Sequence, residues 1–368
     1  MTSRRKLGTT FGAVLAAAAL AGCGPEFDPP SIVDSLRVIA VQKDRPYGTP
    51  GEDVRLNMLW ADASPEAGRP IEITWLTGCV NPPGDLYAGC FANPEAFKPS
   101  NGNEVSFTIP PTIITSRPPP SSPEQPAYGL TYVFFAACAG TLQFDPTGGE
   151  FPLRCVDASG RALGSADFVA GYSAIYVFDE FRNANPIVRG LSIDGKPLFG
   201  GCIDPASAAA AESEELGAVL GRAAGSAGPD GANEPPVVCD ETFPLDAGNP
   251  PDCSAPNAPC LPPVPPGMFA RPSLEIRPEI YRASIEDDEI AKVAYDRDYE
   301  EQMWINYYTT RGSLLTDVRL LNDATTGLNE DFETLFYPPL EPGPVTLWAA
   351  VHDNRGGVAW ARGTLWIQ

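Results

Sequence analysis

Apolar residues along the chain fall into short runs separated by proline, glycine and aspartate. The runs alternate in polarity or are rich in β-branched and aromatic residues, a pattern that predicts β-strands packed in a sandwich. The first half contains the runs Leu36–Val41, Val54–Trp60, Ile71–Trp75, Val105–Ile109, Leu130–Ala136 and Phe168–Phe178. After Asn185-Pro186 the pattern restarts with Ile187–Ile193, Leu274–Ile280, Trp304–Thr310, Val318–Leu321, Phe332–Tyr337, Val345–Val351 and Val358–Ile367. We therefore predict an all-β chain with two sandwiches in tandem, at residues 31–184 and 185–368.

A short internal repeat supports two copies of one sandwich. A tryptophan strand, a strand that ends in Pro-Pro and a long apolar strand recur in this order. In the first copy they are Ile73–Trp75, Phe107–Pro111 and Thr131–Ala136, and in the second they are Met303–Ile305, Leu335–Pro339 and Thr346–Val351.

Residues 203–268 interrupt the second sandwich with a different composition. The segment contains an Ala-, Glu- and Leu-rich stretch, Ala208–Ala224, which predicts one helix of modest stability. It then becomes proline-rich and has too few apolar residues for a core of its own. We interpret it as a disulfide-fastened insertion in the second sandwich, and a linker between domains is the alternative.

The last two strands are expected to form a hairpin whose turn is centred on Arg355. Val345, Leu347, Ala349 and Val351 would then share an apolar core face with residues of the final strand. The opposite face carries a row of aromatic and basic residues: Trp348, His352, Trp360, Arg362 and Trp366. Such a row could stack on sugar rings or anchor a partner protein. The alternative is that it lies under the insertion or against the first sandwich, because three exposed tryptophans would make a large apolar patch.

Part of the second sandwich resembles a known family. The residues concerned are Trp304-Ile305-Asn306-Tyr307-Tyr308-Thr309-Thr310-Arg311-Gly312-Ser313-Leu314, Glu341-Pro342-Gly343-Pro344-Val345-Thr346-Leu347 and Asp353-Asn354-Arg355-Gly356-Gly357. They resemble bacterial Ig-like domains of the polycystic-kidney-disease type, which carry a tryptophan strand, a glycine turn, a Pro-Gly approach and a final hairpin. The family's Trp-Asp-Phe-Gly-Asp-Gly loop is missing, so the resemblance implies an Ig-like sandwich and not that subfamily. Such domains act as spacers or as binding and adhesion modules.

The N-terminal segment resembles a lipoprotein export signal. Basic residues at Arg4–Lys6 precede the apolar run Phe11–Leu20, which is too short to span about 30 Å of hydrocarbon. The run leads into Leu20-Ala21-Gly22-Cys23, which resembles the lipobox of bacterial lipoproteins. The resemblance implies that residues 1–22 are removed and that Cys23 carries the lipid, with residues 23–30 as a tether. An ordinary secretion signal is the alternative.

The chain is strongly acidic, with 25 basic and 47 acidic side chains and a formal charge of −22. Removal of residues 1–22 would take away three basic residues and no acids, which would change the charge to −25. This charge argues against a nucleic-acid partner and against docking on anionic lipid through a basic patch.

Eight of the nine cysteines remain when Cys23 is set aside, an even number that predicts disulfides in an exported protein. In an Ig-like sheet the strand that holds Trp75 lies antiparallel to Leu130–Ala136, which places Cys79 and Cys138 at opposite ends. The local pairs Cys79–Cys90 and Cys138–Cys155 are therefore expected. For the insertion, which has no core of its own, we expect Cys202–Cys239 and Cys253–Cys260, a pairing that the strand geometry does not determine.

Patterns for catalysis and metal binding are missing from the sequence. His352 is the single histidine, no cysteine pair has zinc-site spacing, and no nucleophile or phosphate-binding motif is present. The acidic run Glu286–Glu289 lacks calcium-loop spacing, and we expect a solvated loop there. We expect no cofactor, no metal and no enzymatic activity.

Together these features predict a lipid-anchored binding or structural module of the cell envelope. Gly24 follows the lipobox cysteine, and in that family a residue other than aspartate favours the outer membrane over the inner membrane. The expected partners are the membrane, through Cys23, and an envelope protein or glycan. The alternatives are a passive spacer, which predicts an end-to-end arrangement, and a carbohydrate-binding or carbohydrate-active envelope protein.

The anchor can be tested directly. Cys23→Ala removes the thiol that would carry the lipid, so radiolabelled palmitate should be incorporated into the parent chain and not into the variant. Labelling that persists in Cys23→Ala would show that the lipobox prediction is wrong.

Overall fold

The protein is an all-β chain, as the sequence predicts. The computed structural model describes residues 30–120, 122, 125–145, 151–198, 202–212, 251–254 and 260–368. Every run predicted as a strand coincides with a β-strand. Within these ranges, no helix is long and apolar enough to cross a membrane.

The first unit consists of two facing sheets. Three antiparallel strands form one sheet in the order β1 (Leu36–Lys43), β3 (Asp53–Asp62) and β6 (Glu104–Thr108). Five strands form the other in the order β2 (Tyr47–Gly48), β10 (Phe168–Val177), β7 (Gly129–Cys138), β4 (Glu72–Val80) and β5 (Lys98–Asn101). The core between the sheets contains the fully buried Trp75, whose ring contacts that of Phe135 edge-on.

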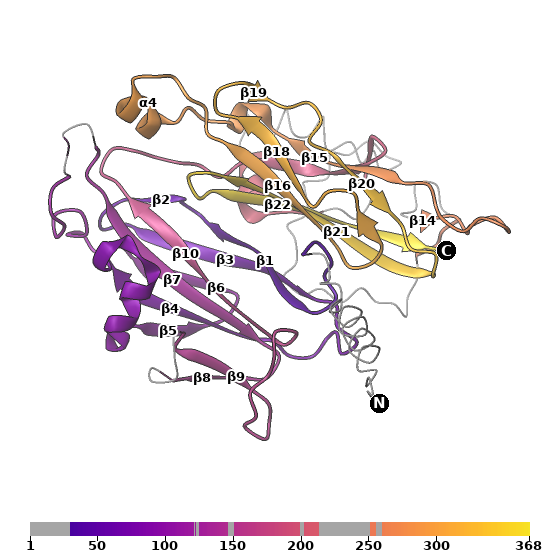
Figure 1. Ribbon diagram of the computed structural model, residues 1–368, viewed down its shortest axis with the longest axis horizontal. Helices are drawn as coiled ribbons and strands as arrows, with labels where there is room; N and C mark the ends of the chain where they lie inside the picture. Colours follow the sequence, from indigo (N-terminus) through magenta and orange to yellow (C-terminus); the bar gives the residue numbers. More distant parts are fainter. Residues whose placement is uncertain are drawn as a thin grey trace, which may run out of the picture.

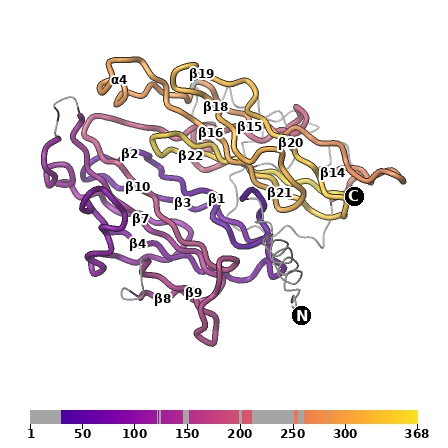
Figure 2. The backbone as a smooth tube through the Cα atoms, in the orientation of Figure 1, coloured from indigo at the N-terminus to yellow at the C-terminus, as the bar shows by residue number. Residues whose placement is uncertain are grey.

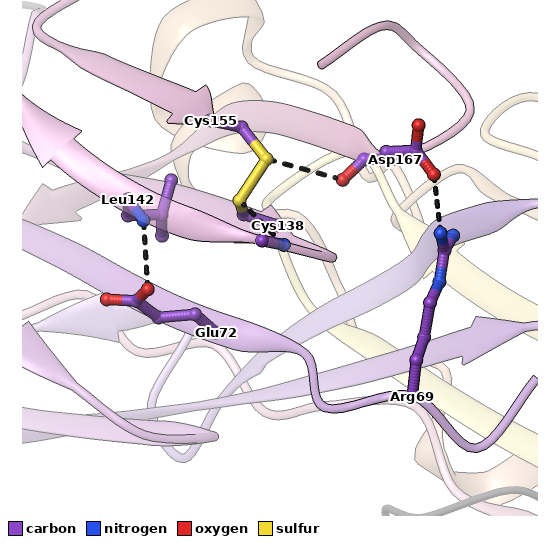
Figure 3. Close-up of a disulfide and its surroundings, with 7 residues drawn as sticks. Arg69, Glu72, Cys138, Leu142, Cys155 and Asp167 are labelled. Atoms are coloured by element: carbon purple, nitrogen blue, oxygen red, sulfur yellow. Dashed lines mark hydrogen bonds and ion pairs between the residues drawn. A yellow bond between two sulfur atoms is a disulfide. The ribbon is translucent and has the colours of Figure 1, made fainter. Parts of the chain in front are cut away.

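The outer face of the five-stranded sheet is covered as well. The covering elements are η1 (Pro83–Asp85), η2 (Tyr87–Ala92), η3 (Pro94–Ala96) and the hairpin of β8 (Thr141–Phe144) and β9 (Leu153–Val156). Figure 3 shows how the hairpin is fastened: a disulfide joins Cys138 to Cys155, and the Glu72 carboxylate accepts the Leu142 N–H at 2.9 Å. As a result β7 is buried along its whole length.

The second unit repeats the strand order of the first. One sheet runs in the order β12 (Lys196–Pro197), β11 (Val188–Ile193), β15 (Leu274–Ile280), β20 (Thr334–Tyr337) and β17 (Ser313–Leu314). The other runs β13 (Cys202–Ile203), β22 (Val358–Ile367), β21 (Gly343–Asp353), β16 (Met303–Thr309), β18 (Val318–Asp323) and β19 (Gly327–Leu328), and β14 (Cys260–Leu261) also pairs with β22. The order β11-β15-β20 in the first of these sheets corresponds to β1-β3-β6 of the first unit. The order β22-β21-β16 in the second corresponds to β10-β7-β4.

The final hairpin has the predicted register. His352 lies opposite Val358 and Trp348 lies opposite Arg362, so the turn is centred on Arg355. The aliphatic face, with Val345 and Leu347 among its residues, belongs to the core between the two sheets of the second unit.

The other face of this hairpin packs against the first unit. Trp348 and Trp360 are 1% and 2% exposed and form one cluster with Ile39 and Leu59 of β1 and β3. Figures 1 and 2 show β1 and β3 between β22 of the second unit and β10 and β7 of the first. The units therefore stack sheet against sheet, in contrast to the end-to-end arrangement that a spacer would show.

Buried hydrogen bonds fix the two units in register. The Gln42 amide of β1 donates to the Asp204 carboxylate at 2.5 Å and to the Val358 carbonyl oxygen at 2.8 Å. Asn185, in the connection between the units, donates to the Lys43 carbonyl oxygen at 2.7 Å and accepts the Val358 N–H at 2.9 Å. Because each of these groups is shielded from water, loss of one partner would leave the other buried and unpaired.

Asp204 also begins the helix α2 (Pro205–Glu212). Its carboxylate accepts the N–H groups of Ala206 and Ser207 at 3.0 Å each, which satisfies donors at the helix N-terminus. The predicted helix Ala208–Ala224 thus begins earlier, at Pro205, and residues 213–224 lie outside the described residues.

The described ends of the segment 203–268 pair with the second unit. β13 and β14 both hydrogen-bond to β22, which favours an insertion over a linker between domains. Two further short helices of this unit lie outside the segment, η4 (Arg282–Ser284) and α4 (Glu289–Tyr295).

The disulfides follow the predicted local pairing where they are described. Cys79 is bonded to Cys90, Cys138 to Cys155 and Cys253 to Cys260. The antiparallel pairing of β4 with β7, on which the prediction depends, is also present. Cys202 is disulfide-bonded, and its expected partner Cys239 lies outside the described residues.

The interface predicts a large stability effect. Trp360→Ala should lower the free energy of unfolding by about 3–5 kcal/mol, because it removes a fully buried ring from a packed cluster. Urea titration followed by circular dichroism measures the change. Tyr337→Ala, at a ring that is 40% exposed on β20, should change the value by about 0.5 kcal/mol or less. A Trp360→Ala variant as stable as Tyr337→Ala would contradict the interface.

Candidate functional site

The aromatic row expected from the sequence is not one exposed surface. Trp348 and Trp360 lie in the core between the units, which agrees with the alternative that the row packs against the first sandwich and not with an exposed binding face at these two residues. Arg362 and Trp366 are half-buried beside β13 and β14. Of the row, His352 lines a cavity, and the other four residues are not part of its described lining. The physical reason is that the first unit covers the centre of this sheet face.

The cavity is a cleft of about 1010 Å³ between the two units. It opens where β1 and β21 end, beside the β21–β22 turn. One wall comes from β10 and from the connection that leads to β7, and it carries Tyr128, Tyr172 and Tyr176 together with the triplet Pro118–Pro120. The other wall comes from the second unit and includes Trp304, His352, Ile290 and the turn Asp353–Gly357. Lys43 and Tyr47 also line the cleft.

The first wall presents aromatic faces. Tyr172 and Tyr176 project from the same side of β10, with Ala174 between them, and they are 47% and 42% exposed. Tyr172 stacks on Tyr87 with ring centroids 4.7 Å apart, and Tyr176 lies 5.8 Å from Tyr128. These contacts hold the rings in place while they remain open to a ligand.

The second wall contains a stacked pair. The His352 ring lies parallel to the Trp304 ring, with centroids 5.3 Å apart and an interplanar angle of 15°. Burial lowers the pKa of His352 to about 4, so the imidazole is neutral near pH 7. His352 therefore contributes an apolar face to the cleft and no positive charge.

Lys43 is a buried cation at the cleft. It is 4% exposed, and its Nζ donates to the carbonyl oxygen of Ala174 on β10 at 3.0 Å. Burial lowers the pKa of Lys43 to about 8, and the negative charge of Asp353 acts in the opposite sense. In the described part of the chain, no carboxylate lies within 4.0 Å of this ammonium.

Arg355 ties the β21–β22 turn to neighbouring segments. Its Nη2 lies 2.7 Å from the fully buried Glu301 carboxylate and 2.6 Å from that of Glu286. Burial, and then the charge of Asp353, raise the pKa of Glu301 to about 7. Glu286 is thus part of an ion-pair network, whereas the sequence pattern predicted a solvated loop.

Asp353 is the one carboxylate among the described residues that line the cleft. Its Oδ1 accepts the N–H groups of Arg355 and Gly357 at 2.8 and 2.7 Å, and its Oδ2 accepts the Asn183 amide at 3.2 Å. Asp353 therefore shapes the turn and is already engaged. Within the described ranges, no group of three or more His, Cys, Asp and Glu residues could hold a metal ion.

Sequence reasoning missed most of this cleft. The tyrosine pair was within reach, because Tyr172 and Tyr176 share one face of a strand that was predicted correctly. The place of Lys43 in the cleft could not be predicted, because its burial depends on Ala174 and on Gly356, where a Cβ atom would lie 2.6 Å from the Lys43 Nζ. Those residues come from two other segments of the chain.

Comparisons with known proteins leave the family open. No protein-family model matches the chain, and no curated protein matches it. Among solved structures, alpha-2-macroglobulin of Escherichia coli aligns at 10% identity with a TM-score of 0.19, over 93% of this chain and 22% of that one. Dimeric latent PorU of Porphyromonas gingivalis aligns at 9% identity with a TM-score of 0.18, over 92% of this chain and 24% of that one. This chain thus spans less than a quarter of either structure.

The buried lysine predicts a pH dependence. Between about pH 8 and 10.5 the unfolded chain binds a proton at residue 43 and the folded chain does not, so stability rises with pH through this window. Across this pH window the free energy of unfolding of the parent should rise by about 3 kcal/mol relative to that of Lys43→Met. Urea unfolding at three pH values measures the difference. Lys98→Met, at an exposed lysine on β5, should show the same change of unfolding free energy with pH as the parent. If Lys43→Met also showed the same change as the parent, the lowered pKa of Lys43 would be contradicted.

Proposed function

We propose that this protein is a lipid-anchored, non-catalytic binding module of the cell envelope, held in the outer membrane by Cys23. The cleft between the units is its binding site. The observation that carries the proposal is this cleft, which combines aromatic faces with hydrogen-bond donors, the usual composition of a recognition site.

The position of the cleft relative to the chain start supports the proposal. Ile32 forms a bridge with Thr309 at one end of β16, whereas Trp304 of the cleft lies near the other end. Five residues of extended strand separate the two by ~17 Å. A tether at residues 23–30 would therefore enter at one end of the interface, and the cleft would open at the other.

The matching strand orders of the two units support a pair of Ig-like sandwiches at residues 31–184 and 185–368. Sandwiches of this kind serve many functions, so the fold does not choose between a spacer and a binding module. The sheet-against-sheet packing speaks against a spacer, because it shortens the molecule relative to an end-to-end arrangement.

A carbohydrate-active protein is less well supported. Most glycosidases use two carboxyl groups on either side of the bond that they cleave. The described lining of the cleft offers Asp353 alone, and that carboxylate already accepts three N–H groups.

Site-specific photo-crosslinking tests the binding site in living cells. A benzophenone amino acid in place of Tyr176, in the cleft, should give a crosslinked adduct with an envelope component. The same amino acid in place of Tyr337 is the control, because that ring is equally exposed on a distant sheet. Equal crosslinking at the two positions, or none at position 176, would refute the cleft as the binding site.

A further inference from the structure

The cleft offers hydrogen-bond donors that the protein itself does not use. Lys43 Nζ has three N–H groups and one acceptor, the Ala174 carbonyl oxygen. The Asn354 side chain uses its oxygen for the Gln302 N–H and leaves its amide nitrogen without an acceptor in the described part of the chain. The same holds for the indole N–H of Trp304 and, on the first wall, for the hydroxyl of Tyr176.

The carboxylates around the cleft, in contrast, are already engaged. Asp353 accepts three N–H groups, and Glu301 and Glu286 are bonded to Arg355. The cations at the cleft, Lys43, Arg355 and Arg117, thus face four carboxylates, because Asp85 pairs with Arg117 at 2.8 Å, and this leaves no positive excess for an anionic ligand. The same pairing leaves none of these carboxylates free for a cationic ligand. We therefore expect a ligand that is uncharged and rich in hydrogen-bond acceptors.

The aromatic wall also restricts the shape of a ligand that fits the cleft. Tyr172 and Tyr176 are four residues apart on one strand, ~13 Å along β10, with the small Ala174 between them. Pro118–Pro120 and the stacked Trp304 and His352 rings extend the apolar lining. The ligand must therefore have flat apolar groups that repeat along an extended axis.

We infer that the cleft binds a proline-rich segment of a partner protein in the polyproline II conformation. Proline has no backbone N–H, so such a segment presents carbonyl acceptors without donors, and its rings pack on aromatic side chains. A neutral glycan fits less well, because it carries several hydroxyl protons per ring, whereas the neutral imidazole of His352 and the hydroxyls of Tyr172 and Tyr176 are few acceptors for them. This inference rests on the proposed function and specifies the partner of the same site.

Fluorescence anisotropy with fluorescein-labelled deca-proline tests the inference, with the full chain purified in detergent. Saturable binding is expected to the parent, and the double change Tyr172→Ala with Tyr176→Ala should weaken it at least tenfold. The change to phenylalanine at both positions keeps the rings and should weaken binding less. Tyr337→Ala should bind as the parent does, and circular dichroism verifies that all variants are folded.

Three outcomes would overturn the inference. They are equal binding of a labelled glycine-serine decapeptide, binding that the double alanine change leaves intact, and displacement of the probe by a neutral oligosaccharide at lower concentration than by unlabelled deca-proline. Crosslinking at position 176 without deca-proline binding would overturn the proline-rich partner and leave the proposed function standing. Deca-proline binding without crosslinking in cells would refute the proposed function, and with it the assignment of a proline-rich partner in the envelope.

Discussion

The burial of Trp348 and Trp360 against β1 and β3 is the constraint on which the rest of the structure depends. Two sandwiches joined by a short connection would otherwise be free to move independently. Here the outer face of one sheet becomes the inner face of a second core, so that the chain forms four stacked layers. Gln42 and Asn185 then fix the register, because their buried polar groups are satisfied in one arrangement of the two units.

The cleft is a product of this docking. Neither unit has the site by itself: the tyrosines come from the first unit, and Trp304 and His352 come from the second. Lys43 illustrates the dependence, since its ammonium is confined between β10 of its own unit and the glycine-containing turn of the other. A change at the tryptophan interface would therefore alter the shape of the cleft without touching any residue that lines it.

Much of the fold could be predicted because its signals are local. Strand periodicity determines which side chains share a face, so the hairpin register and its aliphatic core followed from the positions around Arg355. The pairs Cys79–Cys90 and Cys138–Cys155 followed from the direction of two strands. The burial of Trp348 and Trp360 could not be predicted in this way, because a row of aromatic and basic residues suits an exposed binding face as well as a buried contact. The residues that cover the two tryptophans, Ile39 and Leu59, lie about 300 positions earlier in the sequence. The cleft could not be predicted for the same reason, because its two walls come from segments that are far apart in the sequence.

The start of the described chain has a mechanical consequence. Residues 31–33 pair with Thr309 before the chain enters β1. The Val33 N–H donates to the Thr309 carbonyl oxygen and the Thr309 N–H donates to the Ser31 carbonyl oxygen, each with an N to O distance of 2.8 Å. Any pull on the N-terminus therefore loads the second unit first, although the first unit comes next in sequence. The bridge runs parallel to β16, so a pull directed along that strand loads its two hydrogen bonds together in shear. Tension applied ahead of Ser31 would be carried into the sheet that contains β16, β21 and β22, which holds the two units together.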